Sequence, residues 1–245
     1  MRLQLTLNSS DYFTLPVEHN HIIQSFIYRS ISDELAKNLH DIGFEINNRR
    51  FRLFTFSRIM GQYSLNRQKR EITFKPPVNL VVSSAISQFA EELGNEMLRR
   101  ENIRIGRNSV FVESVEVSNF KFQKNRYKIK MLSPMTIYST LSKANGKKKT
   151  YYYTPFENEF SELISANAVK KYESLYKKNI NGNITLSGHY VSNSNLKIIN
   201  YKGTIIKGWM GIYELSGNPE LMSLVYDTGL GGKNAQGFGC FEVLV

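Results

Sequence analysis

The order of two hydrophobic periodicities most constrains the fold of the first half of the chain. Alternating apolar and polar residues indicate strands, and apolar residues spaced three and four apart indicate helices. Ser32 fits an N-cap that divides the first helical region in two. The predicted strands are 2–8, 52–57, 70–77 and 108–117, and the predicted helices are 19–31, 32–42 and 83–100. This is the β-α-β-β-α-β order of a ferredoxin-like domain.

The second half repeats this pattern. Asn218, Pro219 and Gly229 fit the N-cap, first position and end of a short helix. The predicted strands are 126–133, 183–191, 196–200, within 203–215 and 237–245, and the predicted helices are 155–178 and 218–229. We therefore expect an α+β protein of two tandem ferredoxin-like domains, 1–120 and 121–245, joined near 118–123. The third strand, 70–77, is expected to end at Pro76-Pro77, because proline donates no backbone hydrogen bond.

A glycine-rich loop, TGLGGKNAQGFG, runs from Thr228 to Gly239. A dinucleotide fingerprint would need glycine where Asn234 stands, and a P-loop would need Ser or Thr there, after Lys233. Both motifs also need a helix after the loop, whose N-terminal N–H groups hold the phosphate. Here the residues after Gly239 fit a short strand. The sequence therefore argues against a mononucleotide site.

The chain is strongly basic, with a formal net charge of +11. Most of the excess lies in residues 119–245, which hold 17 Lys and Arg against 8 Asp and Glu. Such a balance favours a polyanionic partner, nucleic acid first and an acidic membrane surface second. A solvated basic surface without a partner is the alternative reading.

Cysteine and histidine usage bounds the chemistry. Cys240 is the single cysteine, so no internal disulfide framework is expected and a reducing cytoplasm fits. One Cys and four scattered His make a structural zinc site improbable. No long apolar run and no signal peptide are recognisable, so we expect a cytoplasmic protein without a membrane partner.

These elements together resemble the CRISPR-associated endoribonucleases of the RAMP superfamily, which cut precursor CRISPR RNA within each repeat. The VEHNHIIQSFIYRSI helix, the LHD triplet and the RLFTFS strand match in order and placement. The most specific element is the loop, G-x-G-x-x-x-x-x-G-F-G, formed by Gly229, Gly231, Gly237, Phe238 and Gly239. The resemblance covers the whole chain.

The resemblance implies RNA cleavage without metal or cofactor. The 2′-hydroxyl attacks the adjacent phosphate and leaves a 2′,3′-cyclic phosphate and a 5′-hydroxyl. In archaeal members of the family a Tyr, a His and a Lys share the work, and by position they match Tyr28, His40 and Arg52. Arg52 departs from the pattern, and because arginine is a poor proton donor it is expected to stabilise charge only. Arg50 could take its place.

His40 also has support from its position. It lies in the last turn before Gly43, where the helix dipole and Asp41 favour the imidazolium. A titrating imidazole suits acid or base catalysis at cellular pH. The alternatives are an ordinary solvent-facing histidine, and for Tyr28 a role in core or interface packing. The sequence does not say which of the two is the acid.

Contacts to RNA are expected from the loop and from basic stretches. Lys233 and the backbone of Gly229, Gly231, Gly237 and Gly239 could bind the RNA backbone, or the loop could pack on the first domain and set the cleft between domains. Arg49 and Arg50 are further candidates. Other basic stretches that could follow an RNA hairpin are 67–70, 147–149, 170–171 and 177–178.

Two other readings stay open. The chain could be a non-catalytic RAMP-type subunit that holds CRISPR RNA in an interference (Cascade-like) complex, or a general RNA chaperone. For the endoribonuclease and for the RAMP-type subunit the expected partner is CRISPR repeat RNA. A homodimer is also open.

Overall fold

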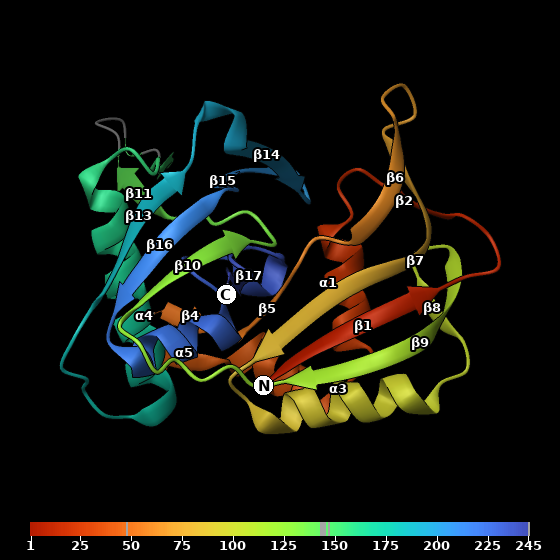
Figure 1. Cartoon of the computed structure of the whole chain (residues 1–245), viewed down its shortest axis with the longest axis horizontal. Helices are drawn as coiled ribbons and strands as arrows, with labels where there is room; N and C mark the ends of the chain where they lie inside the picture. Colours follow the sequence, from red (N-terminus) through yellow and green to blue (C-terminus); the bar gives the residue numbers. More distant parts are fainter. Residues whose placement is uncertain (48, 143–145, 147, 245) are drawn as a thin grey trace.

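The computed structural model describes residues 1–47, 49–142, 146 and 148–244. Two antiparallel sheets, each with its own helices and its own core, lie side by side (Figure 1). In the view of Figure 1 the marked ends of the chain lie close to the line where the two halves meet.

The first sheet has the strand arrangement of a ferredoxin-like domain. β1 lies between β7 and β9, and β5 pairs with β7 on the other side. The short strands β2, β6 and β8 extend this sheet. Its strands are β1 (Arg2–Asn8), β2 (Phe13–Pro16), β5 (Phe54–Phe56), β6 (Met60–Asn66), β7 (Glu71–Ser84), β8 (Ile103–Ile105) and β9 (Asn108–Ser118).

Helices α1 (Asn20–Tyr28), α2 (Asp33–Lys37) and α3 (Ser87–Arg99) belong to this half. Their apolar faces join the alternate leucines of β1 in one core. Ser32 caps α2 as expected, since its Oγ accepts the N–H of Leu35. The helix continues as a π-helical turn, η1 (Asn38–Ile42), and ends at Gly43, whose φ is +61°.

The second sheet repeats the arrangement in the order β13-β16-β10-β17. Its strands are β10 (Arg126–Met131), β13 (Ile184–Tyr190), β16 (Ile212–Gly217) and β17 (Phe241–Leu244), with helices α4 (Asn158–Tyr176) and α5 (Pro219–Thr228). Asn218 caps α5 through the N–H groups of Glu220 and Leu221. The two tandem ferredoxin-like folds predicted from the sequence are confirmed.

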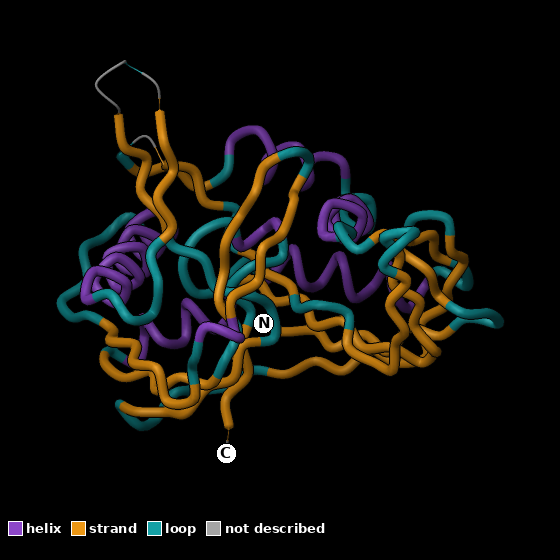
Figure 2. The backbone as a smooth tube through the Cα atoms, turned by 90° about the horizontal axis from the view of Figure 1, so that it is seen from above, coloured by secondary structure: helices purple, strands orange, loops and turns teal. Residues whose placement is uncertain are grey.

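Three hairpins are added to this framework. They are β3 (Phe44–Ile46) with β4 (Arg49–Phe51), β11 (Tyr138–Ser142) with β12 (Lys148–Tyr152), and β14 (Leu196–Tyr201) with β15 (Thr204–Trp209). The β11–β12 hairpin projects from the body of the molecule (Figure 2, upper left). Of the basic stretch 147–149, residue 147 lies outside the described residues, and Lys148 and Lys149 belong to β12.

The prediction that a strand ends at Pro76-Pro77 is wrong, because β7 continues to Ser84. β6 pairs with β7 up to Lys75 and again at Asn79, with a register shift between these pairs. β1 begins its pairing with β7 at Val78. The two prolines therefore occupy positions that no neighbouring strand pairs with, and their missing N–H groups interrupt no ladder.

Other boundaries also shift. The predicted helix 83–100 begins only at Ser87, because Ser83 and Ser84 still pair with β5. The predicted strand region 203–215 is divided at Gly211, whose φ is +128°. The predicted helix 155–178 is shorter at both ends, as α4 spans Asn158–Tyr176.

The two halves are joined through buried polar contacts. Arg2 donates from Nη1 to the carbonyl of Phe241 (2.8 Å) and from Nη2 to that of Tyr226 (2.9 Å). Thr55 of β5 donates to the carbonyl of Phe238 (2.9 Å). The first and last strands are thus held against each other, which fixes how the glycine-rich loop meets the first half.

Candidate active site

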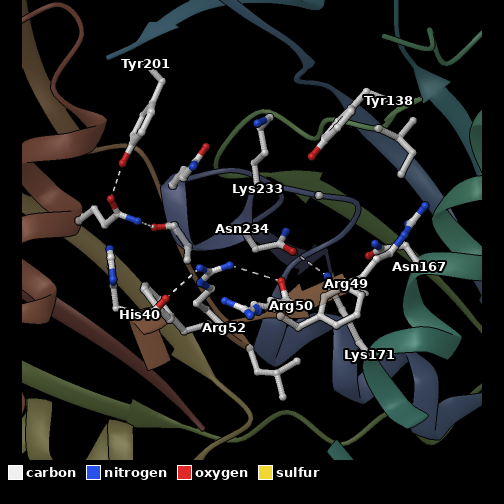
Figure 3. A pocket seen from close by; sticks show the side chains of 18 of the residues that line it. His40, Arg49, Arg50, Arg52, Tyr138, Asn167, Lys171, Tyr201, Lys233 and Asn234 are labelled. Carbon is white, nitrogen blue, oxygen red and sulfur yellow. Dashed lines mark hydrogen bonds between the residues drawn. The ribbon is translucent and has the colours of Figure 1, made fainter. Parts of the chain in front are cut away.

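A cleft of about 860 Å³ lies between the two halves and is lined by residues of both. The first half contributes Tyr28 from α1, His40 from η1, and Arg49, Arg50 and Arg52 from β4 and the residues after it. The second half contributes the glycine-rich loop, α4 and the start of β11. Figure 3 shows His40 and Arg52 close together in this cleft, with Lys233 and Tyr138 on its other side.

Tyr28 and His40 are in contact although they belong to different elements. Their rings meet edge to face with centroids 5.9 Å apart, and the other neighbour of Tyr28 is the buried ring of Phe54. Burial raises the pKa of the Tyr28 phenol to about 12, against a smaller opposing effect of Arg52. The Tyr28 hydroxyl is therefore protonated at neutral pH.

His40 is held by its neighbour in sequence. Its Nδ1 lies 2.8 Å from Oδ1 of Asp41, and this hydrogen bond lowers the pKa of the Asp41 carboxyl. An ionised carboxylate can only accept, so Nδ1 must carry the hydrogen. In the neutral ring Nε2 then keeps its lone pair. The His40 side chain is 71% exposed, so this nitrogen is free to meet a substrate.

Arg52 is fastened to the same turn. Its Nη2 donates to the backbone carbonyl of His40 (2.9 Å), and Nη1 lies 3.4 Å from the carbonyl of Arg50. Arg52 thereby places a permanent positive charge beside the catalytic candidates. Arg50 is engaged elsewhere, because it donates to the carbonyl of Asp41 and lies 3.8 Å from a carboxylate oxygen of Glu45. The geometry favours Arg52 over Arg50 for the cationic role.

Lys233 brings a cation from the opposite half. Its Nζ lies 5.0 Å from the centroid of the Tyr138 ring, within the range of a cation–π contact. Burial lowers the pKa of Lys233. Arg49 is exposed on β4 and also lines the cleft. The cleft thus combines a phenol, an imidazole and several cations, a set suited to acid–base chemistry on a phosphodiester.

The sequence of the chain matches two family models that together span most of its length. Residues 14–116 match "CRISPR-associated protein Cas6, N-terminal", and residues 112–243 match "CRISPR associated protein Cas6, C-terminal". The chain belongs to the Cas6 family. The resemblance seen in the sequence is confirmed by these matches.

Individual relatives are distant but cover nearly the whole length. A Methanocaldococcus jannaschii protein named CRISPR-associated endoribonuclease Cas6 1 is 26% identical, over 98% of this chain and 91% of the relative. The CRISPR-associated endoribonuclease Cas6 of Pyrococcus furiosus is 25% identical, over 94% and 84%. A solved structure described as a Cas6-related gene product from Pyrococcus furiosus has a TM-score of 0.85 at 19% identity, covering 100% and 98%.

The four glycines of the loop motif in this Cas6 chain, Gly229, Gly231, Gly237 and Gly239, lie in the interior rather than in the cleft. Gly229, Gly237 and Gly239 donate their N–H groups to carbonyl oxygens of the protein itself. A Cβ on Gly237 would lie 2.5 Å from the ring of Phe56 in β5. Gly231 is buried as well. The loop therefore packs against the first half, the second of the two expectations, and direct contacts of these glycines with RNA stay a prediction that this burial disfavours.

The prediction that the basic pair Lys170–Lys171 follows the RNA is wrong for Lys171. Lys171 is 1% exposed and cannot follow an RNA backbone. Its position could have shown this, because it lies seven residues after Ile164 and three after Ala168, on the apolar face of α4. The prediction considered only the charge of the two lysines and not this helical spacing.

Other cleft residues were not foreseen. Tyr201, at the end of β14, hydrogen bonds through its hydroxyl to Oε1 of Gln24 in α1, and both side chains line the cleft. Tyr138 was likewise missed. These residues come from hairpin ends that carry no motif, so only the fold brings them to the site.

Within the described part of the chain, no group of three or more His, Cys, Asp or Glu side chains is placed to hold a metal ion. No described helix combines the length and the apolar character needed to cross a membrane.

Proposed function

We propose that this Cas6-family chain is an endoribonuclease that cuts precursor CRISPR RNA within its repeats. Relatives that align with nearly its whole length are named as endoribonucleases. The observation that carries the proposal is the convergence of Tyr28, His40 and Arg52 on one side of the interdomain cleft. The basic residues around the same cleft suit a polyanionic substrate.

The chemistry needs no group beyond these side chains and the RNA. Nε2 of His40 takes the proton of the 2′-hydroxyl, and the 2′ oxygen forms a bond to the adjacent phosphorus. The bond from phosphorus to the 5′ oxygen then breaks, and the Tyr28 phenol donates a proton to the departing oxygen. The products are a 2′,3′-cyclic phosphate and a 5′-hydroxyl, with no water consumed.

The assignment of base and acid follows from the two environments. The hydrogen on Nδ1 of His40 points to Asp41, which leaves Nε2 as the acceptor. The pKa of Tyr28 is about 12, so its phenol holds a proton to give. Arg52 stabilises the negative charge that develops on the phosphorane oxygens. Lys233 and Arg49 hold flanking phosphates, and Arg50 is a further candidate that would first have to leave its contacts with Asp41 and Glu45.

The test is a cleavage assay in EDTA on the repeat RNA of the neighbouring CRISPR array. One substrate is all-ribose, and its matched control carries a single 2′-deoxy nucleotide at the cut site. We expect the ribose RNA to be cut and the deoxy RNA to be bound but intact. If both are bound and neither is cut, the chain is instead an RNA-holding RAMP-type subunit.

A further inference from the structure

A buried lysine holds the glycine-rich loop from inside the second half. Lys171 of α4 is 1% exposed, and its Nζ donates to three oxygens of the loop. These are the carbonyl of Gly229 (2.6 Å), the carbonyl of Gly231 (3.1 Å) and Oδ1 of Asn234 (2.7 Å). None of its three partners is a carboxylate. A lysine buried in this way is unusual and calls for a specific role.

The number of acceptors matches the number of donors. An ammonium group has three hydrogens, and each finds one oxygen in the loop. Two of these oxygens belong to backbone carbonyls on either side of Leu230. The Lys171 side chain therefore fixes the backbone conformation of the first turn of the loop. An apolar side chain here would leave all three oxygens without this partner.

Asn234 links this anchor to the rest of the loop. Its Nδ2 donates to the carbonyls of Leu230 and Phe238, both at 3.0 Å, while its Oδ1 accepts from Lys171. The preceding residue is Lys233, whose φ of +57° is the left-handed conformation. The backbone at 233–234 thus turns the Asn234 side chain inward, and the Lys233 side chain lines the cleft.

The opposite side of the loop is bound by the first half. Asn20 and Gln24 of α1 donate to the carbonyls of Gln236 (2.8 Å) and Ala235 (2.7 Å). Thr55 of β5 donates to the carbonyl of Phe238. Because α1 also carries Tyr28, the loop is fixed between Lys171 on one side and a helix that carries a catalytic candidate on the other.

We propose that Lys171 is a positioning residue of the cleavage reaction, which fixes loop 229–239 and through it places Lys233 at the RNA-binding cleft. This inference rests on the proposed function for its effect on RNA, whereas its effect on the loop is independent of RNA. Lys171 lies at the wall of the cleft but is 1% exposed, and its three hydrogen bonds go to the loop. We therefore expect its influence on RNA to pass through Asn234 and the backbone of Gly229 and Gly231.

The first experiment needs no RNA. Hydrogen–deuterium exchange of the peptide covering 229–239 is compared in wild type, Lys171→Met and Lys170→Met. Lys170 is the matched control, since it is the next residue on α4 and lines a separate groove between α4 and β13. We expect exchange in this peptide to rise about tenfold or more in Lys171→Met alone, with the β1 and α3 peptides unchanged. Unchanged exchange in the loop would overturn the proposal.

The second experiment is a double-mutant cycle on repeat RNA. Binding and single-turnover cleavage are measured for Lys171→Met, Lys233→Met and the double variant. If Lys171 acts through Lys233, its substitution weakens binding about as much as Lys233→Met does and adds little in the Lys233→Met background. A merely structural role would give an equal loss in both backgrounds, and that result would contradict the proposal.

A second variant covers the case in which Lys171→Met does not fold. Asn234→Ala removes one of the three acceptors from the loop side, together with the two hydrogen bonds that its Nδ2 donates to Leu230 and Phe238, and leaves α4 intact. It should also raise exchange in 229–239, and wild-type exchange rates would count against the anchor. If wild type cuts no repeat RNA, the proposed function fails, while the exchange data still decide whether Lys171 orders the loop.

Discussion

The ring of Tyr28 meets the ring of His40 edge to face, 5.9 Å between centroids, across the boundary of two separate helical elements. The two rings come from separate elements. Tyr28 is the last residue of α1, and His40 lies in η1, which follows the short helix α2 capped by Ser32. The pair is also linked to Arg52 through the carbonyl of His40. The three catalytic candidates therefore form one connected group. Because each has a different proposed role, their variants should have different effects on cleavage, RNA binding and stability.

His40→Ala should abolish most cleavage and leave RNA binding nearly intact. Loss of a general base slows the chemical step by about 10²–10⁴-fold. Single-turnover cleavage and filter binding on the same repeat RNA measure the two effects. His189→Ala is the control, since His189 lies in β13 and does not line the cleft. Wild-type cleavage by His40→Ala would refute the assignment of the base.

Tyr28→Phe should reduce cleavage about 10²-fold or more while the melting temperature changes little. The substitution keeps the ring that packs on Phe54 and His40 and removes only the hydroxyl. Tyr12→Phe, at an exposed tyrosine outside the cleft, is the matched control. A Tyr28→Phe protein as active as the control would leave Tyr28 with a packing role alone.

Arg52→Met should lower the rate of cleavage far more than Arg52→Lys does. Lysine keeps a positive charge near the phosphate, whereas methionine keeps only the length. Both variants lose the guanidinium that donates to the His40 carbonyl, so both should destabilise η1 to a similar extent. Rates are compared with thermal stability for each variant, and equal rates for the two would argue against a role of charge.

The buried amine of Lys171 should make the free energy of unfolding depend on pH. Burial lowers its pKa in the folded chain to about 7, whereas an exposed lysine in the unfolded chain titrates near 10.4. The unfolded chain therefore binds more protons between these values, and the stability that depends on this residue rises with pH across that window. The slope can reach about 1.4 kcal/mol per pH unit.

The measurement is the difference in unfolding free energy between wild type and Lys171→Met from pH 6.5 to 9.5. This difference should shift in favour of wild type as pH increases, since methionine does not titrate. The other titrating groups are shared by both proteins and cancel. A difference independent of pH would mean that the three loop oxygens hold the Lys171 pKa near its ordinary value.

Lys233→Met should weaken RNA binding and also reduce its salt dependence. Each phosphate contact to single-stranded RNA contributes about −0.7 to the slope of log K against log salt, and losing one contact should make the slope shallower by about that amount. Binding isotherms at several salt concentrations give the slope. An unchanged slope would place Lys233 away from the RNA backbone.

Local periodicity predicted the elements that are amphipathic along their whole length. β1 follows a strict alternation and α3 a helical stripe, so their existence and type could be read directly. β8 has only three residues, and β6 is exposed along nearly all of its length, so neither leaves a hydrophobic pattern. β7 passes two prolines because its partners change there, which no local rule contains.

In the candidate site, too, some features could be predicted from the sequence and others depend on tertiary packing. Tyr28, His40 and Arg52 were identified through a resemblance in the order of motifs, and the fold brings them together. The inward direction of the glycines and of Lys171 depends on the packing of α4 and β5 against the loop. Those elements lie far from the loop in sequence, so such contacts could not be inferred from the loop itself.

The contacts of Arg2 with Phe241 and Tyr226 have a consequence for the order of folding. They join residues that are 239 and 224 positions apart in the chain, and Thr55 reaches across to Phe238 over a similar separation of 183. Contacts between residues so far apart require the closure of long loops, which is slow. Domains generally fold as units, so each half can form its own core before the cleft between them is assembled.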